Sequence, residues 1–275
     1  MKKIINYYFG LYPDQIINNY DSYFFKCNNK YYSLYEVKNI DTINDVYELS
    51  NSIFNNGIKT YRIIPTNDNN LFIYFNNRYY ALLGIEENYN EKINLMDIIN
   101  FLNININYDN KKYIDWKYLW INKNNNLEYQ FKINENKYKN IKKEFYYYQG
   151  LSYLAISLID KIKVKNISIQ HRRVNKDTIK YEYYNPFNYI YDDRVRDLAN
   201  YYKSNEYDLK IVNIYPEEWL NFFIRYIYPT EFYDKFENDN LDVESINSNV
   251  NRIKKTYNLI RNICLLPNIE WIMQH

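Results

Sequence analysis

The chain has 275 residues, 47% of them hydrophobic and 25% charged, which excludes a disordered chain and allows one large domain or two lobes. Its formal net charge is +2 at pH 7, so charge gives no general reason to expect a nucleic-acid partner. No run of uncharged apolar residues approaches the length of a membrane span.

The first 85 residues combine strand signals and turn residues with one helix among them. The predicted strands cover residues 16–27, 30–37, 60–65, 71–75 and 78–85. Asparagine pairs at 28–29 and 76–77 are typical of hairpin turns. Apolar residues at helical spacing predict a helix that opens at Asp41 and Thr42 and stops at Asn56 and Gly57. The order of strand, strand, helix and three further strands favours an antiparallel sheet.

Residues 86–93 are polar and form the predicted linker, after which the chain reads as mainly helical. Apolar stripes at helical spacing run from Trp116 to Phe131, Tyr147 to Ile162, Val195 to Tyr202, Trp219 to Phe236 with a break at Pro229, and Val243 to Cys264. The segment from His171 to Tyr191 is predicted to be non-helical. The last stripe has the spacing of a packing seam, either inside the protein or against a partner helix.

The lysines near the N-terminus precede an apolar stretch that is short and is interrupted at Asn6, Pro13 and Asp14, so we expect no signal peptide. Cys27 and Cys264 stand far apart in the sequence and belong to no Cys/His cluster. This pattern argues against a zinc site and favours two buried thiols over a disulfide. We therefore expect a soluble intracellular protein.

Tyrosine is unusually frequent, with Tyr 36 against Gly 4. These tyrosines either take the place of leucine and phenylalanine in the core or form a surface that favours protein contacts. The few glycines exclude a glycine-rich phosphate loop and a dinucleotide fingerprint. With His 2 in the chain, one of them the terminal His275, metal or triad chemistry based on histidine is also excluded.

Several motifs follow one another along the chain. They are SNSIFNNGIKTYRIIPTNDNNLFIYFNNRYYALL, DWKYLW, FYYYQGLSYLAISLI, HRR, NPFNYIYDDRVRDLANYY, WLNFFIRYIYPTEFYDKFE and LPNIEW. The ordered set resembles the aminoglycoside phosphotransferase and choline kinase branch of the protein-kinase-like fold, and within it the YutH-type and CotS-like spore coat proteins. The resemblance implies a two-lobed α+β fold. Its N-terminal lobe would be an antiparallel sheet over residues 1–88, and its C-terminal lobe would be mainly helical over residues 89–275.

The resemblance can be applied residue by residue to the positions that bind nucleotide and metal in active members. Active members hold the nucleotide phosphates with a lysine on the third strand. Here Tyr35 takes that position, unless Lys38 three residues further on is the true match. The Asp-Phe-Asp metal motif corresponds to Pro186, Phe187 and Asn188, so its first carboxylate is missing. Asn188 offers a neutral oxygen, whereas magnesium usually takes a carboxylate and phosphate oxygens.

The catalytic loop of active members has an aspartate two positions after its histidine, which accepts the proton of the substrate hydroxyl. Here the loop reads His171, Arg172 and Arg173, so a fixed cation replaces the acceptor. Thr178 stands where the resemblance expects a metal-binding asparagine, with Asn175 nearby. We expect His171 to pack and hydrogen-bond within the loop, while the two arginines still suit an anion.

Three aspartates follow the loop. Asp197 matches a position that in the family braces the catalytic-loop backbone, and it also suits the first turn of a helix. Asp192 and Asp193 would be metal ligands if the match is shifted by a few residues. Otherwise we expect them to cap the next helix and to pair with Arg194 or Arg196.

These losses favour a degenerate kinase-fold protein without phosphotransferase activity that is a structural or assembly component of the bacterial spore coat. One alternative is an active or residual small-molecule kinase with relocated ligands at Lys38, Asp192 and Asp193. Another is a regulatory module that binds an anion through Arg173. The main hypothesis expects no metal and no cofactor, and the kinase alternative requires ATP and magnesium. The expected partners are other spore coat or intracellular proteins, in the cytoplasm or in the coat.

Overall fold

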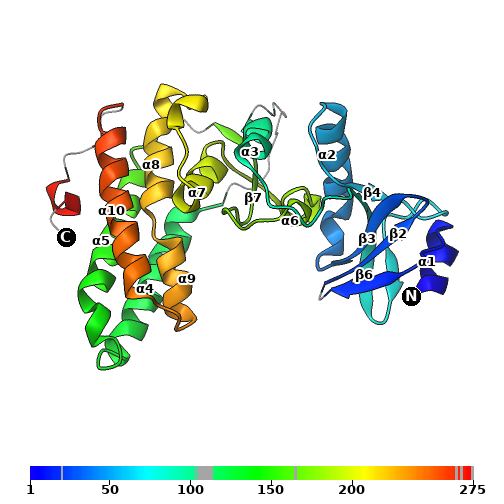
Figure 1. Ribbon diagram of the computed structural model, residues 1–275, viewed down its shortest axis with the longest axis horizontal. Coiled ribbons are helices and arrows are strands. Elements are labelled where there is room, and N and C mark those ends of the chain that lie inside the picture. Colours follow the sequence, from blue (N-terminus) through cyan, green and yellow to red (C-terminus); the bar gives the residue numbers. More distant parts are fainter. Residues whose placement is uncertain are drawn as a thin grey trace. The chain divides into compact units, whose positions relative to one another are not determined.

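The computed structural model describes residues 1–19, 21–102, 104, 114–163, 166–263, 266 and 269–273. The chain forms two compact units. The first consists of Met1–Asn105 and His171–Ile190, and the second of Ile106–Gln170 and Tyr191–His275. Sheet strands dominate the first unit and helices the second (Figure 1).

The described residues of the first unit form a sheet and several helices. Its strands are β1 (Ile16–Asn19), β2 (Ser22–Cys27), β3 (Lys30–Val37), β4 (Arg62–Ile64), β5 (Ile73–Phe75) and β6 (Arg78–Ile85). Its helices are α1 (Lys2–Phe9), α2 (Ile43–Asn55), α3 (Leu95–Leu102) and α6 (Lys180–Tyr183), and its 3-10 turns are η1 (Ile40–Thr42) and η3 (Pro186–Asn188).

The strands pair in the order β1-β2-β3-β6-β4, with β5 also paired to β6, and each of these pairings is antiparallel. This confirms the predicted antiparallel sheet. The single strand predicted over residues 16–27 is wrong, because Asn19 pairs with Ser22 and the chain reverses between them. Asn18, Asn19 and Asp21 are turn-forming residues that interrupt the apolar pattern at this point.

Both predicted asparagine turns are present. Asn28 and Asn29 connect β2 to β3 with φ angles of 49° and 59°, and Asn76 and Asn77 connect β5 to β6 with the same two values. Two successive residues in the left-handed region form the hairpin turn whose twist matches the flanking strands. Asparagine tolerates this region better than most residues, which explains the pairs.

Side chains alternate along the strands and give the sheet two faces. One of them, called the outer face, carries Phe25, Cys27, Tyr32, Leu34, Tyr80 and Leu82. Helix α1, which the sequence pattern did not predict, covers this face with Ile5 and Phe9 (Figure 1). Cys27 is buried there, as predicted, whereas Cys264 lies outside the described residues.

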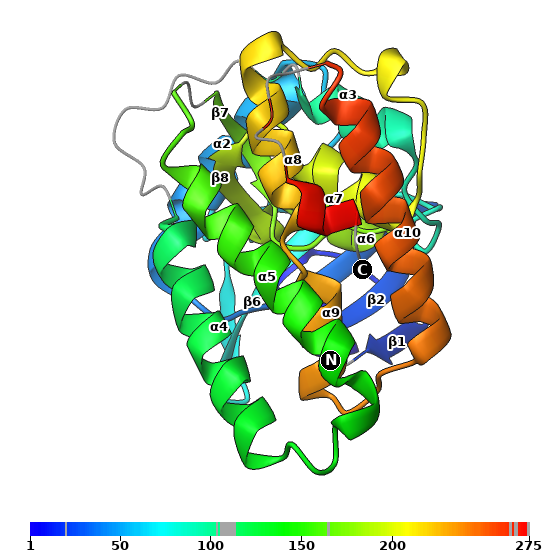
Figure 2. The same cartoon turned by 90° about the vertical axis from the view of Figure 1, so that its left-hand side faces the viewer.

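The second unit is mainly helical. Its helices are α4 (Trp116–Ile133), α5 (Lys142–Ile159), α7 (Arg196–Ser204), α8 (Trp219–Ile227), α9 (Thr230–Glu237) and α10 (Val243–Ile260), and its 3-10 turns are η2 (Lys139–Ile141), η4 (Leu209–Ile211), η5 (Pro216–Glu218) and η6 (Glu270–Met273). Helices α4 and α5 form an antiparallel hairpin, and α8 contacts α5, α7 and α10 (Figure 2). Among the described helices, none has the length and apolar character needed to cross a membrane.

Helix α8 is buried on nearly all sides, and its sequence WLNFFIRYI contains one charged residue, Arg225. A helix that is apolar all round belongs in the interior of a fold, so its single charge must find a partner there.

The apolar stripe predicted along α4 included Leu119, and this is wrong, because the Leu119 side chain is exposed. The buried face of α4 continues instead through Trp120, Asn124 and Leu127.

Strands β7 (Ile167–His171) and β8 (Tyr189–Asp193) form a separate two-stranded sheet. The division between the compact units falls at the end of β7 and inside β8. The prediction that 171–191 is non-helical is wrong for Lys180–Tyr183, which forms the single turn α6. The first unit extends past the predicted lobe boundary at residue 88, because residues 89–105 and 171–190 belong to it. That boundary concerns the lobes of the fold and stays a prediction.

Candidate functional site

The other face of the sheet, called the inner face, carries Tyr35, which the resemblance predicted to stand in place of the phosphate-binding lysine. It consists of Ser22, Phe24, Ser33, Tyr35, Ala81 and Leu83, which are cross-strand neighbours in the pairing registers. Phe24 lies opposite Ser33, and Ser22 lies opposite Tyr35. Because side chains alternate along β3, Tyr35 points to the same face as Ser33.

Three aromatic side chains from other segments of the first unit cover this face. Tyr89 stacks on Phe24 with ring centroids 5.0 Å apart, and Tyr181 meets the same ring edge-on at 4.7 Å. Phe187 stacks on Tyr35 at 5.0 Å. We call Tyr89, Tyr181 and Phe187 the aromatic layer. Aromatic pairs in these arrangements are favourable beyond the area they bury.

A buried hydrogen bond fixes the middle of the aromatic layer. The hydroxyls of Tyr181 and Ser33 lie 2.8 Å apart, and both side chains are buried. Burial raises the pKa of Tyr181 to about 12, so its hydroxyl keeps its proton at neutral pH. Burial likewise raises the pKa of Tyr35. Neither phenol supplies the positive charge that a lysine would bring to this face.

Backbone hydrogen bonds hold the aromatic layer in place. The amide nitrogen of Tyr181 donates to the carbonyl of Tyr89 over 2.8 Å, and that of Lys180 donates to Glu91 over 2.8 Å. The amide of Ile93 donates to Thr178 over 3.0 Å in the opposite direction. The predicted linker is therefore hydrogen-bonded to the segment after the catalytic-loop position, with one antiparallel bridge between Lys92 and Ile179.

His171 lies at the end of β7 and is 1% exposed. Its ring stacks on Tyr183 with centroids 3.8 Å apart, and the rings of Phe101 and Tyr189 meet it edge-on at 4.9 and 5.1 Å. His171 therefore packs as predicted, against rings that lie outside its loop, and its predicted hydrogen bond within the loop stays a prediction. The aromatic cage excludes water from the ring.

The two arginines that follow His171 are exposed. The backbone amide of Arg172 donates to the carbonyl of Asn188 over 3.1 Å, which joins the loop to the end of η3. Asn175 and Thr178 form a local turn, in which the backbone amide of Asn175 donates a hydrogen bond to the Thr178 hydroxyl over 2.9 Å. Arg173 was predicted to stand in place of the catalytic aspartate, and its side chain is exposed.

The remaining candidates of the first unit are occupied by structural contacts. Lys38 follows β3, has a side chain that is 74% exposed, and lies 3.9 Å from the Asp21 carboxylate. The side-chain amide of Asn188 donates to the carbonyl of Glu182 over 2.9 Å. The structure does not bring Lys38 and Asn188 together with Asp192 and Asp193 in one unit.

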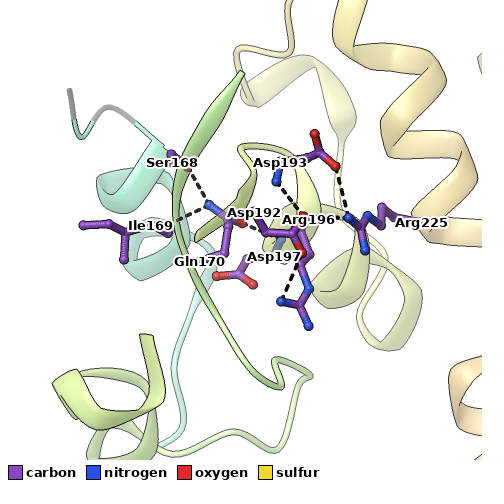
Figure 3. Close-up of polar contacts among 8 residues, drawn as sticks. All are labelled: Ser168, Ile169, Gln170, Asp192, Asp193, Arg196, Asp197 and Arg225. Atoms are coloured by element: carbon purple, nitrogen blue, oxygen red, sulfur yellow. Dashed lines mark hydrogen bonds and ion pairs between the residues drawn. The ribbon is translucent and has the colours of Figure 1, made fainter. Parts of the chain in front are cut away.

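Asp192 and Asp193 belong to the second unit and lie side by side at the end of β8 (Figure 3). Nη2 of Arg225 is 2.6 Å from Oδ1 of Asp192 and 3.0 Å from Oδ2 of Asp193. Nη1 of Arg196 is 3.3 Å from the second oxygen of Asp192. The predicted pairing with Arg196 is confirmed for Asp192. The predicted pairing with Arg194 is not, because Arg194 binds the Glu218 carboxylate at 2.8 Å.

Two tryptophans flank the two arginines of this cluster. The guanidinium carbon of Arg225 lies 4.8 Å from the ring centre of Trp116 and 5.4 Å from that of Trp120, while that of Arg196 lies 4.6 Å from Trp116. Cations are attracted to such ring faces, most strongly where water is excluded. Burial raises the pKa of Asp192, and the two arginines oppose this rise.

Asp197 stands in the first turn of α7 and is 1% exposed. Its backbone amide donates to Oε1 of Gln170 over 2.9 Å, and Nε2 of Gln170 donates to Ser168 and Ile169 (Figure 3). The start of α7 is thus joined to the residue before His171. The role of the Asp197 carboxylate as a brace stays a prediction.

A family model described as "Spore coat putative kinase YutH" matches residues 2–235. The chain belongs to the YutH spore coat family. No curated protein matches the chain. Within the described residues of this YutH-family chain, no group of three or more histidine, cysteine, aspartate or glutamate side chains is placed to hold a metal ion.

Solved structures similar to this YutH-family chain are phosphotransferases. An aminoglycoside phosphotransferase from Alicyclobacillus acidocaldarius aligns with a TM-score of 0.68 at 9% identity, over 96% of this chain and 95% of that one. The spectinomycin phosphotransferase APH(9)-Ia, in complex with ADP and spectinomycin, aligns with a TM-score of 0.60 at 9% identity, over 92% of both chains. These similarities show the two-lobed, kinase-like α+β fold and confirm the predicted fold class.

Sequence reasoning about this YutH-family chain missed Arg225, Tyr89 and Tyr181. Arg225 had a usable signal, since a lone charge in an apolar helix predicts a buried ion pair. Its partners could not be named, because they are distant in sequence. The tyrosines had no such signal, because 36 tyrosines in one chain make each of them unremarkable as a sequence feature.

Proposed function

We propose that the chain is a kinase-fold protein without phosphotransferase activity that serves as a structural or assembly component of the spore coat. The observation that carries the proposal is the aromatic layer on the inner face of the sheet. Active members of the fold set nucleotide phosphates against a lysine on this face. Here Tyr35 replaces the lysine and stacks on Phe187, and Tyr181 bonds to Ser33.

The chemistry of phosphoryl transfer supports the same conclusion. That reaction depends on positioning and on cations that neutralise phosphate charge, together with an acceptor for the hydroxyl proton. Arg173 is a permanently protonated side chain at the acceptor position. Asp192 and Asp193 are already paired with arginines, so these residues do not fit a magnesium–nucleotide complex.

Thermal unfolding with and without Mg–ATP tests the loss of nucleotide binding. A ligand that binds only the folded state raises the midpoint, by an amount that grows with the logarithm of its concentration relative to its Kd. We expect a shift within experimental error, and no consumption of ATP above the buffer rate. The spectinomycin phosphotransferase APH(9)-Ia, whose structure contains ADP, is the positive control under the same conditions.

A rise of several degrees with Mg–ATP would contradict the proposal. If phosphate transfer accompanied the rise and disappeared in Asp193→Ala, the ligands would be relocated and the chain would be a kinase. If inorganic phosphate alone raised the midpoint and Arg173→Ala removed the effect, the chain would instead be an anion-binding module.

The coat role is tested separately, in the native host. A variant carrying Lys38→Met and Arg173→Ala removes exposed cations that the kinase and anion-binding alternatives would need. If the chain acts by its structure, this variant restores the coat composition of a deletion strain as well as the wild type does. A fluorescent fusion that never reaches the coat would contradict the role in assembly.

A further inference from the structure

The Asp192–Asp193 pair has the composition of a divalent-cation site and the geometry of an ion pair. We propose that Arg225 is a built-in counter-ion that replaces a divalent cation at this acidic pair, so that the second unit folds without metal. The proposal concerns residues of the second unit alone. It is therefore independent of whether the first unit binds nucleotide.

The distances leave no room for both cations. Nη2 of Arg225 lies 2.6 and 3.0 Å from one oxygen of each aspartate. A magnesium ion on the same two oxygens would need to approach each within about 2.1 Å. It would then occupy the space of the guanidinium nitrogen. Arg196 holds the other Asp192 oxygen from a second direction.

The two arginines also offset the charge of the acidic pair. Two carboxylates face two guanidinium groups, and all four side chains are less than one-tenth exposed. The buried Asp197 carboxylate acts on Arg196 as well, so Arg225 is the cation that both Asp192 and Asp193 share. Removing one arginine would leave a buried negative charge, which is strongly unfavourable unless another cation replaces it.

A small cavity beside the pair supplies the remaining features of a latent cation site. It measures about 50 Å³ and is lined by Asp193, Asn221 and Arg225, with Trp116 and Trp120 among its walls. Oδ1 of Asn221 is buried and has no hydrogen-bond partner among the described residues. Removing the Arg225 side chain would enlarge this cavity and leave two carboxylates and one amide oxygen facing it. Oxygen ligands of this kind suit Mg²⁺ and Mn²⁺.

The test compares the wild type with Arg225→Ala, with Mn²⁺ as the probe. We expect wild-type melting to be the same in EDTA and in millimolar Mn²⁺, with no bound Mn²⁺ in the electron paramagnetic resonance spectrum. Arg225→Ala should melt roughly 10 °C lower, because it leaves a buried charge unpaired. Millimolar Mn²⁺ should recover several degrees of this loss, and the spectrum should show bound metal.

Arg78→Gln is the matched control, since Arg78 also pairs with a carboxylate, that of Glu36 at 2.6 Å, but has a side chain that is 56% exposed. It should lose little stability and gain no Mn²⁺ response. If Arg225→Ala fails to fold, the double variant Asp193→Asn with Arg225→Met removes both charges and should fold. A double variant that also fails would overturn the counter-ion role.

Two further results would overturn the proposal. One is Mn²⁺ binding by the wild type that disappears in Asp193→Asn. The other is an Arg225→Ala protein that is as stable as the wild type, or that is destabilised without any recovery in Mn²⁺. A wild-type response to Mg–ATP without a response to Mn²⁺ would contradict the proposed function and leave the counter-ion role intact.

Discussion

Tyr181 combines an apolar ring with one buried hydroxyl, and each part has its own contact. The ring packs against Phe24, and the hydroxyl bonds to Ser33, which is fully buried. Ser33 therefore depends on Tyr181 for a hydrogen bond that water cannot easily replace. Arg173 shows the opposite case, because its identity changes the chemistry of the loop while its exposed position gives it little weight in folding.

Tyr181→Phe removes only the hydroxyl. We expect the free energy of unfolding to fall by about 1–2 kcal/mol, because a buried hydroxyl is left without its partner. Tyr129→Phe is the control, since the Tyr129 side chain is 67% exposed, and it should change stability by less than about 0.5 kcal/mol. Urea unfolding of both variants measures the difference. Equal stabilities would show that the Ser33–Tyr181 bond contributes nothing measurable.

Helix α8 is held at both ends by charged side chains. At its start, the Glu218 carboxylate accepts from the backbone amide of Tyr215 over 3.0 Å and binds Arg194 at 2.8 Å. At its end, Nζ of Lys203 donates to the carbonyls of Arg225 and Tyr228 over 3.0 and 2.7 Å. The Lys203 contacts satisfy carbonyls that α8 leaves unpaired at its end, whereas the Glu218 contact fixes the 3-10 turn η5 that leads into α8. They allow an otherwise apolar helix to end inside the second unit.

Glu218→Gln keeps the shape of the side chain and removes its charge. The buried Arg194 guanidinium would then lose the carboxylate charge 2.8 Å away, which costs about 3–5 kcal/mol of stability. Glu206→Gln is the matched control, because Glu206 pairs with Arg252 at 3.1 Å but remains 31% exposed, and its loss should cost about 1 kcal/mol or less. Chemical denaturation distinguishes the two. A Glu218 variant as stable as the Glu206 variant would contradict the larger contribution to stability that we expect from the buried Glu218–Arg194 pair.

Across the entire chain, tyrosine is a main component of the interior. Burial raises the pKa of many tyrosines in both units. They include Tyr61, Tyr147, Tyr148, Tyr181, Tyr184, Tyr189, Tyr207, Tyr226, Tyr228 and Tyr233. The reading of tyrosine as a core residue is therefore confirmed. Exposed tyrosines such as Tyr7 and Tyr12 leave the adhesive role open as well.

This composition predicts alkaline unfolding. Because the folded-state pKa of these phenols is raised, their contribution to stability is complete below the unfolded pKa near 10 and is lost as the pH rises above it. Each such group lowers the free energy of unfolding by about 1.4 kcal/mol per pH unit there. Ten groups together exceed the usual stability of about 5–15 kcal/mol within roughly one unit. Circular dichroism and phenolate absorbance should therefore change together between about pH 10 and 12.

A gradual rise of phenolate absorbance while the circular dichroism stays native would contradict this prediction. It would mean that the buried tyrosines ionise without unfolding. Addition of salt at pH 7 is the control, because it screens surface charges and leaves the buried phenols protonated.

Local patterns were sufficient for much of the fold. Alternating side chains and asparagine pairs gave β3 and β6 their bounds, and helical spacing located α2, α5 and α10. The same patterns failed where a short segment takes its structure from distant contacts. Helix α1 forms against the outer face of the sheet, and β7 pairs with β8 across some twenty intervening residues. Periodicity within a short window contains no information about such partners.

The sequence resemblance predicts Arg173 in place of the catalytic aspartate and Tyr35 in place of the third-strand lysine, and this prediction needs no coordinates. Folding decided which neighbours the side chains in these parts of the chain meet. Tyr181 reaches Ser33 across 148 residues of sequence, and Arg225 reaches Asp192 across 33. A residue type fixes which proton or charge a side chain can hold, whereas burial and long-range packing fix which neighbour it meets.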